Sequence, residues 1–209
     1  MGLQKYLKLY IILDRRVGAP RSLEDQARAA LEGGATIIQL RDKDMSGREL
    51  YEDARKIAPL CKRAGSAFIV NDRLDIALAS GADGVHLGAK DIPVSAARSL
   101  VPEGFLIGAS AHSIEEGRLA EAEGADYVGI GAVFATGTKD GAIVIGLDGV
   151  RAVRSILSIP SVAIGGISED NAGEVMATGV DGVALASAVV GKRDIAAAAR
   201  RFVSILSPS

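Results

Sequence analysis

Residues 33–40 of this chain read GGATIIQL, and three later stretches repeat the pattern: SGADGVHL at 80–87, EGADYVGI at 123–130 and TGVDGVAL at 178–185. In each stretch, a glycine of the kind that ends helices precedes a short apolar run typical of a buried strand. The same phrase therefore introduces a strand four times along the chain. Recurrence of this kind indicates a repeated structural unit.

Eight apolar runs in all are predicted strands, and helical patterns separate them. The runs are continuous rather than alternating, which is typical of parallel strands covered on both faces. Such a chain forms either a closed barrel or an open, doubly wound sheet. The repeat introduces every second strand, and a two-strand unit repeated four times favours closure, because the interior layers of a barrel draw on alternate strands. The predicted strands are Leu9–Leu13, Thr36–Leu40, Ala67–Val70, Gly84–Leu87, Leu106–Ala109, Tyr127–Ile130, Val162–Ile164 and Val183–Leu185.

The predicted fold is therefore α/β: one (β/α)8 TIM barrel domain over residues 1–209, with its core at about residues 9–206. The composition agrees, since 209 residues with 48% hydrophobic side chains suit one domain of this kind. A net charge of −2 argues against a nucleic-acid or anionic-membrane partner. Cys61, the single cysteine, lies in a helical pattern and is predicted to be a core residue. We see no leader or membrane-spanning run and expect a cytoplasmic protein.

Polar residues gather where the predicted strands end, which is the functional face of such a barrel. Gln39, Arg41 and Lys43 keep a period of two beyond the second strand, so their side chains are expected to share one face. Asn71 and Asp72 follow the third strand, where the simpler interpretation is that one of them caps the next helix. Helix caps are also predicted at Ser22, Ser46, Ser113 and Ser168.

The fourth and fifth strands add candidates whose roles the sequence leaves open. Asp91 follows the fourth strand, and with Asp72 it suits a shared Mg²⁺ ion, which proteins hold through one or two carboxylates plus substrate phosphates. His86 is as compatible with a hydrogen-bonded interior residue as with a catalyst. Ser110 and His112 form either a polar turn or further hydrogen-bond donors at the mouth.

The last three strands end in loops suited to anions. Thr136, Thr138 and Lys139 follow the sixth strand, and the longest connection in the chain continues through residues 140–146 as a candidate lid. Gly165 and Gly166 end the seventh strand, and a helix is expected to begin just after them at Ser168. A glycine turn at a helix start is a common phosphate site.

A second small-residue turn with the same properties, Ala186-Ser187, ends the eighth strand. No catalytic triad, zinc spacing or dinucleotide motif is present. The predicted mouth is suited to binding two anionic groups rather than to supplying a nucleophile.

These residues, in this order, resemble the thiamine-phosphate synthases over about residues 9–206. The motifs that carry the resemblance are QLRDK at 39–43, NDR at 71–73, HLG at 86–88 with Asp91, GASAH at 108–112, TGTK at 136–139, AIGGI at 163–167 and Ser187-Ala188. The resemblance implies joining of 4-amino-5-hydroxymethyl-2-methylpyrimidine diphosphate to 4-methyl-5-(2-phosphooxyethyl)thiazole, with release of pyrophosphate by a dissociative displacement.

The family pattern also implies roles for individual residues. It assigns the pyrimidine diphosphate to Gln39, Arg41, Lys43, Asn71, Ser110 and Lys139, with Lys139, Ser110 and Arg41 taking part in catalysis. It assigns Mg²⁺ to Asp72 and Asp91, and the thiazole phosphate to Thr136, Thr138, Gly166, Ala186 and Ser187. Small phosphorylated molecules are then the partners, and a homo-oligomer is compatible with the pattern.

The chain departs from the family pattern in two places. Ala89 and Lys90 stand where the family commonly has glutamine and often an acidic residue, and the 140–146 loop is unusually apolar. Two alternatives stay open. A related thiazole tautomerase would use His112 for proton transfer, and a non-catalytic barrel would only bind a phosphorylated ligand.

Overall fold

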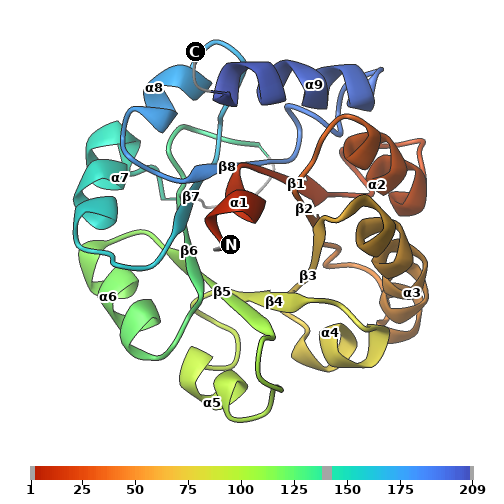
Figure 1. The fold of residues 1–209 in the computed structure, drawn as a ribbon, viewed down its shortest axis with the longest axis horizontal. Coiled ribbons are helices and arrows are strands. Elements are labelled where there is room, and N and C mark those ends of the chain that lie inside the picture. Colours follow the sequence, from red (N-terminus) through yellow and green to blue (C-terminus); the bar gives the residue numbers. More distant parts are fainter. Residues whose placement is uncertain (1–2, 138–142, 208–209) are drawn as a thin grey trace.

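The structure, a computed structural model, describes residues 3–137 and 143–207, and within them eight parallel strands close into a barrel (Figure 1). The strands follow one another around the barrel in chain order, and β8 pairs with β1. The strands are β1 (Leu9–Leu13), β2 (Ile37–Leu40), β3 (Ala67–Asn71), β4 (Gly84–Leu87), β5 (Leu106–Ala111), β6 (Tyr127–Gly131), β7 (Ser161–Ile164) and β8 (Gly182–Leu185). The predicted (β/α)8 fold is confirmed.

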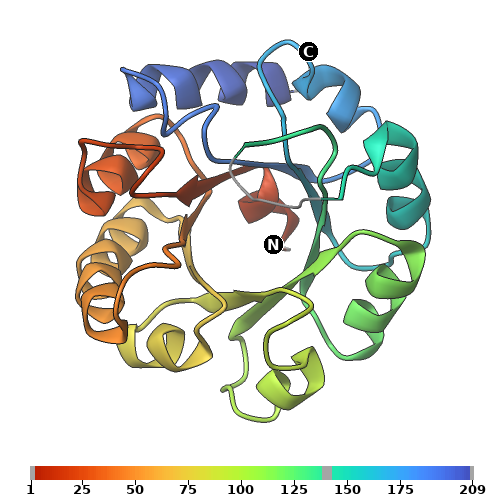
Figure 2. The same cartoon turned by 180° about the vertical axis from the view of Figure 1, so that it is seen from behind.

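Helices form an outer ring around the barrel, one after each strand, and a further short helix precedes β1 (Figures 1 and 2). They are α1 (Gln4–Leu7), α2 (Leu23–Glu32), α3 (Gly47–Ala64), α4 (Leu74–Ser80), α5 (Val94–Arg98), α6 (Ile114–Ala122), α7 (Gly146–Ser155), α8 (Ala172–Met176) and α9 (Ile195–Leu206). In the part of the chain that the structure describes, none of these helices has the length and apolarity needed to cross a membrane.

The repeated phrase has a structural cause at the amino ends of the strands. Its fourth residue, Thr or Asp, precedes an even-numbered strand, and its side chain accepts a hydrogen bond from a backbone N–H of the preceding odd-numbered strand. The four contacts are Leu9 N to Thr36 Oγ1 (2.9 Å), Phe68 N to Asp83 Oδ2 (2.8 Å), Ile107 N to Asp126 Oδ2 (2.7 Å) and Ser161 N to Asp181 Oδ2 (2.8 Å). The repeat thus clamps the strands together in pairs.

Two hydrophobic clusters hold the barrel and its ring of helices together. The larger one fills the space between strands and helices and includes Cys61, which is fully buried as predicted. The smaller one lies inside the barrel, where Tyr10 and Tyr127 are fully buried. Leu7 of α1 belongs to this interior cluster, so α1 covers the amino-terminal end of the barrel and leaves the opposite end as the mouth.

Helix starts follow the sequence in three places and differ in a fourth. Ser22, Ser46 and Ser113 each accept a hydrogen bond from the backbone N–H three residues on, as expected of N-caps. The prediction of a helix starting at Ser168 is wrong. There the Asn171 side chain accepts from Ser168 N (2.8 Å), which forms a turn, and α8 begins only at Ala172.

Candidate active site

The predicted site residues lie at the carboxyl ends of the strands, which parallel pairing brings to one mouth on the side away from α1 (Figure 2). Thr138 and Lys139 fall outside the described residues, as does part of the predicted 140–146 lid. The described candidates are Gln39 in β2, Arg41 and Lys43 after it, Asn71 and Asp72 at the end of β3, Asp91 after β4, Ser110 in β5, Thr136 after β6, Gly166 after β7, and Ala186 and Ser187 after β8.

The three polar residues of β2 and its loop reach to both neighbouring strands. Gln39 is 3% exposed and donates from Nε2 to the Tyr10 hydroxyl of β1 (2.7 Å). Arg41 Nη1 lies 3.4 Å from Asp14 Oδ2. Lys43, largely exposed, places Nζ 3.8 Å from Asp72 Oδ2. Two cationic side chains therefore stand at the end of β2, and each faces a carboxylate at the end of a neighbouring strand.

Asp14 is a residue that sequence reasoning missed. It directly follows β1, is 9% exposed, and accepts hydrogen bonds at Oδ1 from the backbone N–H groups of Arg16 and Val17. Its other oxygen faces the Arg41 guanidinium. A carboxylate held rigidly in this way orients the arginine toward the mouth. The available signal was its position immediately after the first predicted strand.

Asp72 and Asp91 form a close carboxylate pair, as predicted. Asp72 has a φ of 62°, and its backbone N–H donates to His86 O (2.9 Å), which ties the end of β3 to β4. Asp91 Oδ2 accepts from Gly88 N (2.6 Å). Burial, followed by hydrogen bonding and repulsion from Asp91, raises the pKa of Asp72 from 3.8 to about 6.

Neither Asn71 nor Asp72 caps the following helix, so the simpler interpretation of these residues is wrong. α4 begins at Leu74 with Arg73 in the N-cap position and no side-chain cap. The left-handed backbone at Asp72 is uncommon outside glycine and occurs where structure or function requires it. The polar groups of Asn71 and Asp72 therefore stay at the mouth instead of capping α4.

The carboxylate pair is not joined by further metal-ligating side chains in the part of the chain that the structure describes. Among the described residues, no group of three or more His, Cys, Asp or Glu side chains is suited to hold a metal ion. A carboxylate whose pKa is raised by burial and by a neighbouring carboxylate, as that of Asp72 is, nevertheless suits a divalent cation, which replaces the proton and removes the repulsion. Mg²⁺ is held by one or two carboxylates when a substrate diphosphate supplies further oxygens, so this donor set fits it.

Ser110 and His86 lie together inside the barrel, in agreement with the interior interpretation of His86. The two rings of His86 and Tyr127 have centroids 5.6 Å apart, and His86 Nδ1 lies 3.2 Å from the Tyr127 hydroxyl. Its Nε2 lies 3.1 Å from Ser110 Oγ. His86 is therefore a hydrogen-bonded interior residue that touches a predicted site residue.

The glycine turn after β7 differs from the prediction. Gly165 and Gly166 have φ values of 101° and 65°, which favour glycine. A Cβ on Gly166 would lie 2.6 Å from Phe134 Cβ and 2.7 Å from Ala135 O, so this glycine also makes room for the β6 loop. Because α8 starts six residues later and spans five, turn backbone rather than a helix end faces the mouth.

The loops after β6, β7 and β8 are held next to one another. Val133 N donates to Ile164 O (2.9 Å), Phe134 N donates to Gly165 O (3.0 Å), and β7 pairs with β8 through Ile164 and Ala184. After β8, the N–H groups of Val189 and Val190 both donate to Ala186 O (2.9 Å) and form a single helical turn. The exposed Ser187 lies on this turn.

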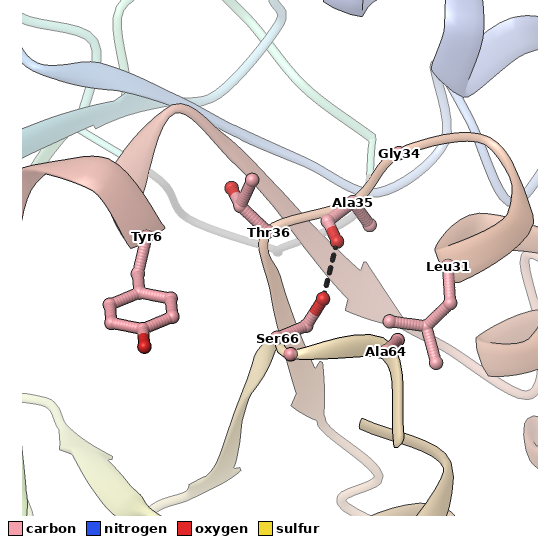
Figure 3. A pocket seen from close by; sticks show the side chains of 8 residues that line it. Tyr6, Leu31, Gly34, Ala35, Thr36, Ala64 and Ser66 are labelled. Atoms are coloured by element: carbon pink, nitrogen blue, oxygen red, sulfur yellow. Dashed lines mark hydrogen bonds between the residues drawn. The ribbon is translucent and has the colours of Figure 1, made fainter. Parts of the chain in front are cut away.

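A separate cavity of about 300 Å³ lies at the other end of the barrel (Figure 3). It is lined by residues just before β2 and β3 together with Tyr6, and Ser66 Oγ donates to Ala35 O (2.8 Å) across it. None of the predicted site residues contributes to this lining. The cavity belongs to the amino-terminal face and not to the mouth.

Comparisons with known proteins agree on one family. The family model described as thiamine monophosphate synthase matches residues 9–189. A thiamine-phosphate synthase of Coprothermobacter proteolyticus is 51% identical over 204 residues, 98% of this chain and 97% of that protein. One from Moorella thermoacetica is 50% identical, with 95% of each chain covered. The solved structure of thiamine phosphate pyrophosphorylase from Pyrococcus furiosus matches with a TM-score of 0.92 and 47% identity, covering 98% of both chains.

Proposed function

The chain belongs to the thiamine monophosphate synthase family, and we propose that its mouth binds a pyrimidine diphosphate beside β2–β5 and a thiazole phosphate beside β6–β8. As an enzyme it is a transferase of thiamine biosynthesis that makes thiamine phosphate. The proposal concerns how the residues at the mouth carry out that transfer. The observation that carries it is the pair of cations and the pair of carboxylates on adjacent strand ends, with small-residue turns at the other side of the barrel.

Arg41, Lys43 and Lys139 are proposed to hold the diphosphate, and Gln39, Asn71 and Ser110 the pyrimidine side of the same substrate. Arg41 is supported by Asp14, so its guanidinium is oriented before the substrate arrives. Lys43 lies next to the carboxylate pair. Its charge there favours a bound diphosphate and lowers the pKa of Asp72.

Asp72 and Asp91 are proposed to hold Mg²⁺ together with the diphosphate. When bound, the ion would neutralise negative charge on the departing pyrophosphate. The residues' own part is to present two carboxylates at one point, which Gly88 N and the backbone contact of Asp72 to His86 enforce.

Thr136, Thr138, Gly166, Ala186 and Ser187 are proposed to hold the thiazole phosphate. Backbone N–H groups of the turns after β7 and β8, with the exposed Ser187 hydroxyl, are donors of the kind that bind phosphate. The contacts among these three loops keep the donors in one place. This position matches the phosphate site that barrels of this class often form after strands seven and eight.

The transfer then needs no nucleophile from the chain. The thiazole nitrogen attacks the pyrimidine methylene, the methylene–oxygen bond breaks, and pyrophosphate leaves with its electron pair. The pyrimidine ring can carry positive charge at the methylene as that bond breaks. The protein orients the two substrates and stabilises the departing negative charge. A mouth with several cationic side chains can make both contributions.

The related thiazole tautomerase is the weaker candidate. His112 has Nδ1 2.8 Å from Glu116 Oε2, so a paired imidazole is present after β5. The relatives at about 50% identity are named synthases, however, and the carboxylate and lysine set around Asp72 is not needed for proton transfer on a thiazole.

Pyrophosphate release in the presence of both substrates tests the proposal. We expect release to require both substrates and added Mg²⁺. Lys139→Ala should lower kcat by about 10²-fold, the scale for losing a preorganised charge at a developing anion. Lys192→Ala, a lysine beyond the β8 turn, serves as the matched control. A Lys139→Ala effect confined to the KM for the thiazole phosphate would assign this lysine to the other substrate.

A further inference from the structure

A row of hydrogen-bonded side chains crosses the barrel interior from one pyrimidine-side residue to the other. It runs from Gln39 Nε2 to the Tyr10 hydroxyl (2.7 Å), from Tyr10 to the Tyr127 hydroxyl (2.8 Å), from Tyr127 to His86 Nδ1 (3.2 Å), and from His86 Nε2 to Ser110 Oγ (3.1 Å). These five residues lie on β2, β1, β6, β4 and β5. The fold thus connects two site residues that are 71 positions apart in sequence.

We propose that Tyr10, Tyr127 and His86 are positioning residues that set which hydrogen-bonding atoms Gln39 and Ser110 offer to the pyrimidine substrate. The inference rests on the proposed placement of the pyrimidine beside Gln39 and Ser110. It adds three residues that touch one another and the two ends of the row, and it gives each a defined donor or acceptor role.

The direction of the row, meaning which group donates to which, follows from the protons that each group can give. An amide nitrogen only donates, so Tyr10 accepts from Gln39 and has its single hydroxyl proton left for Tyr127. Tyr127 in turn donates to Nδ1 of His86. The ring proton of His86 is then on Nε2 and is donated to Ser110 Oγ. This leaves the amide oxygen of Gln39 to accept from a ligand and the hydroxyl proton of Ser110 to donate to one.

An aminopyrimidine has the complementary groups, since its amino group donates and its ring nitrogens accept. If the row ran in the opposite direction, Ser110 would give its proton to His86 and Gln39 would use its oxygen within the row. The two ends would then offer the opposite atoms, an amide N–H at Gln39 and a hydroxyl lone pair at Ser110, to a ring held in the same orientation. The row therefore couples substrate preference at one end of the site to that at the other.

Packing alone does not explain the two buried hydroxyls. Tyr10 and Tyr127 are 1% and 0% exposed, and phenylalanine would fill the same space without placing polar atoms in an apolar interior. Burial raises the pKa of both hydroxyls above the usual range, so both stay protonated and act as donors. The barrel also makes room for the row, because a Cβ on Gly108 would overlap the Tyr127 ring and hydroxyl.

The first test reads the tautomer of His86 directly. The chain has two histidines, so ¹⁵N spectra of the imidazole nitrogens show two sets of signals, and His86→Gln identifies the set that belongs to residue 86. In the wild-type protein without substrate we expect a protonated Nε2 and an unprotonated Nδ1. Tyr127→Phe removes the donor to Nδ1 and should give a mixture of tautomers, while the His112 signals stay unchanged. An unchanged His86 spectrum in Tyr127→Phe overturns the proposal.

The second test measures the effect on the substrate. We expect Tyr127→Phe and Tyr10→Phe each to lower kcat/KM for the pyrimidine diphosphate by about tenfold, with little change in the KM for the thiazole phosphate. Because both act through one row, the double variant should be little worse than Tyr127→Phe alone. Tyr51→Phe, on the outer helix α3, is the matched control and should have wild-type kinetics.

Two replacements of His86 test whether a donor to Ser110 is what the row requires. His86→Gln can still donate to Ser110 from its amide, whereas His86→Leu cannot, so the glutamine variant should keep more of the pyrimidine kcat/KM. Equal kinetics for these two variants, or Tyr→Phe variants that change only thermal stability, would overturn the proposal. The tautomer spectra need no substrate. They therefore separate failure of the row from failure of the proposed pyrimidine site.

Discussion

Asp72 shows at the scale of one residue how burial and a neighbouring carboxylate change the acidity of a side chain at the mouth. Its carboxyl has a pKa of about 6 in the folded protein and an ordinary value of 3.8, because burial and Asp91 both disfavour its charge. Between these two values the folded protein binds more protons than the unfolded chain. The contribution of Asp72 to the free energy of unfolding therefore falls as the pH rises from about 4 to about 6.

Asp72→Asn should remove this contribution. Asparagine also tolerates the φ of 62°, so the substitution adds little backbone strain. In metal-free protein we expect the variant and the wild type to unfold alike near pH 4, and the variant to be the more stable above about pH 6. Thermal unfolding at a series of pH values checks this. A difference between the two proteins that does not vary with pH would contradict the assignment.

Ser187 provides a residue-scale test of the thiazole phosphate side. Its side chain is exposed on the turn after β8, so removing the hydroxyl leaves the packing of the barrel intact. Ser187→Ala should raise the KM for the thiazole phosphate by about tenfold, the scale of one hydrogen bond to a charged group. The KM for the pyrimidine diphosphate and the unfolding midpoint should stay near wild type. If the pyrimidine KM rises instead, Ser187 belongs to the other substrate.

The glycine at position 166 offers no such clean test. From the sequence it is a position where the backbone approaches a ligand, but in the fold its missing Cβ also accommodates Phe134 and Ala135. A larger side chain there would disturb the β6 loop whether or not a phosphate binds. Contacts of this kind, between residues more than 30 positions apart, leave no pattern in the sequence.

At the scale of the elements, the clamp between paired strands explains the repeat that predicted the barrel. Asp181 accepts from Ser161 N, and Ser161 also accepts at its carbonyl from Asp181 N (2.9 Å). Asp181→Ala should lower the free energy of unfolding by about 1–3 kcal/mol, because a buried N–H loses its acceptor. Asp181→Asn keeps an acceptor oxygen and should lose less. Urea unfolding compares the two variants.

This clamp lies at the amino ends of β7 and β8, at the opposite end of the barrel from the mouth. Turnover by folded Asp181→Ala protein should therefore match that of the wild type. An equal loss of stability in the alanine and asparagine variants would mean that the hydrogen bond to Ser161 N is not what stabilises this pair of strands.

The elements were predictable from the sequence to the extent that local patterns determine them. Continuous apolar runs indicated every strand, and Ser22, Ser46 and Ser113 marked three helix starts. The start of α8 was not predictable in this way, because Ser168 and Asn171 are both good caps and the choice depended on the turn that Asn171 forms with Gly166 O (3.1 Å).

At the scale of the whole molecule, the sequence predicted which strand ends carry polar groups, and Asp72 and Asp91 lie at neighbouring strand ends as expected. The approach of Lys43 to Asp72 was not predicted. Nor did the sequence predict the partners that lie across the interior. Tyr10 and Tyr127 are 117 positions apart and both belong to apolar runs, so only the closed barrel reveals that their hydroxyls meet. Asp14 went unnoticed for the same reason, since its partner Arg41 belongs to another strand.

The proposed site would couple metal binding to diphosphate binding, because neither ligand would have a complete site alone. The protein offers two carboxylates for Mg²⁺, and the diphosphate would meet a repulsive carboxylate pair without the ion. A ligand that binds only the folded state raises the unfolding midpoint. We therefore expect Mg²⁺ or inorganic pyrophosphate alone to raise the midpoint slightly, and the two together to raise it by more than the sum.

Two variants at neighbouring positions decide whether this coupling passes through the carboxylates. Asp91→Asn should reduce the combined rise in midpoint, because the pair loses one of its charges. Lys90 is exposed, and its neighbour Asp91 is the residue tied to Gly88 N, so Lys90→Gln should leave the combined rise and the Mg²⁺ requirement unchanged. The alternative is that the Lys90 ammonium replaces part of the metal's charge. If the wild type turns over in the presence of a chelator and Lys90→Gln does not, that alternative is established. The carboxylate pair would then contribute less to turnover than Lys90.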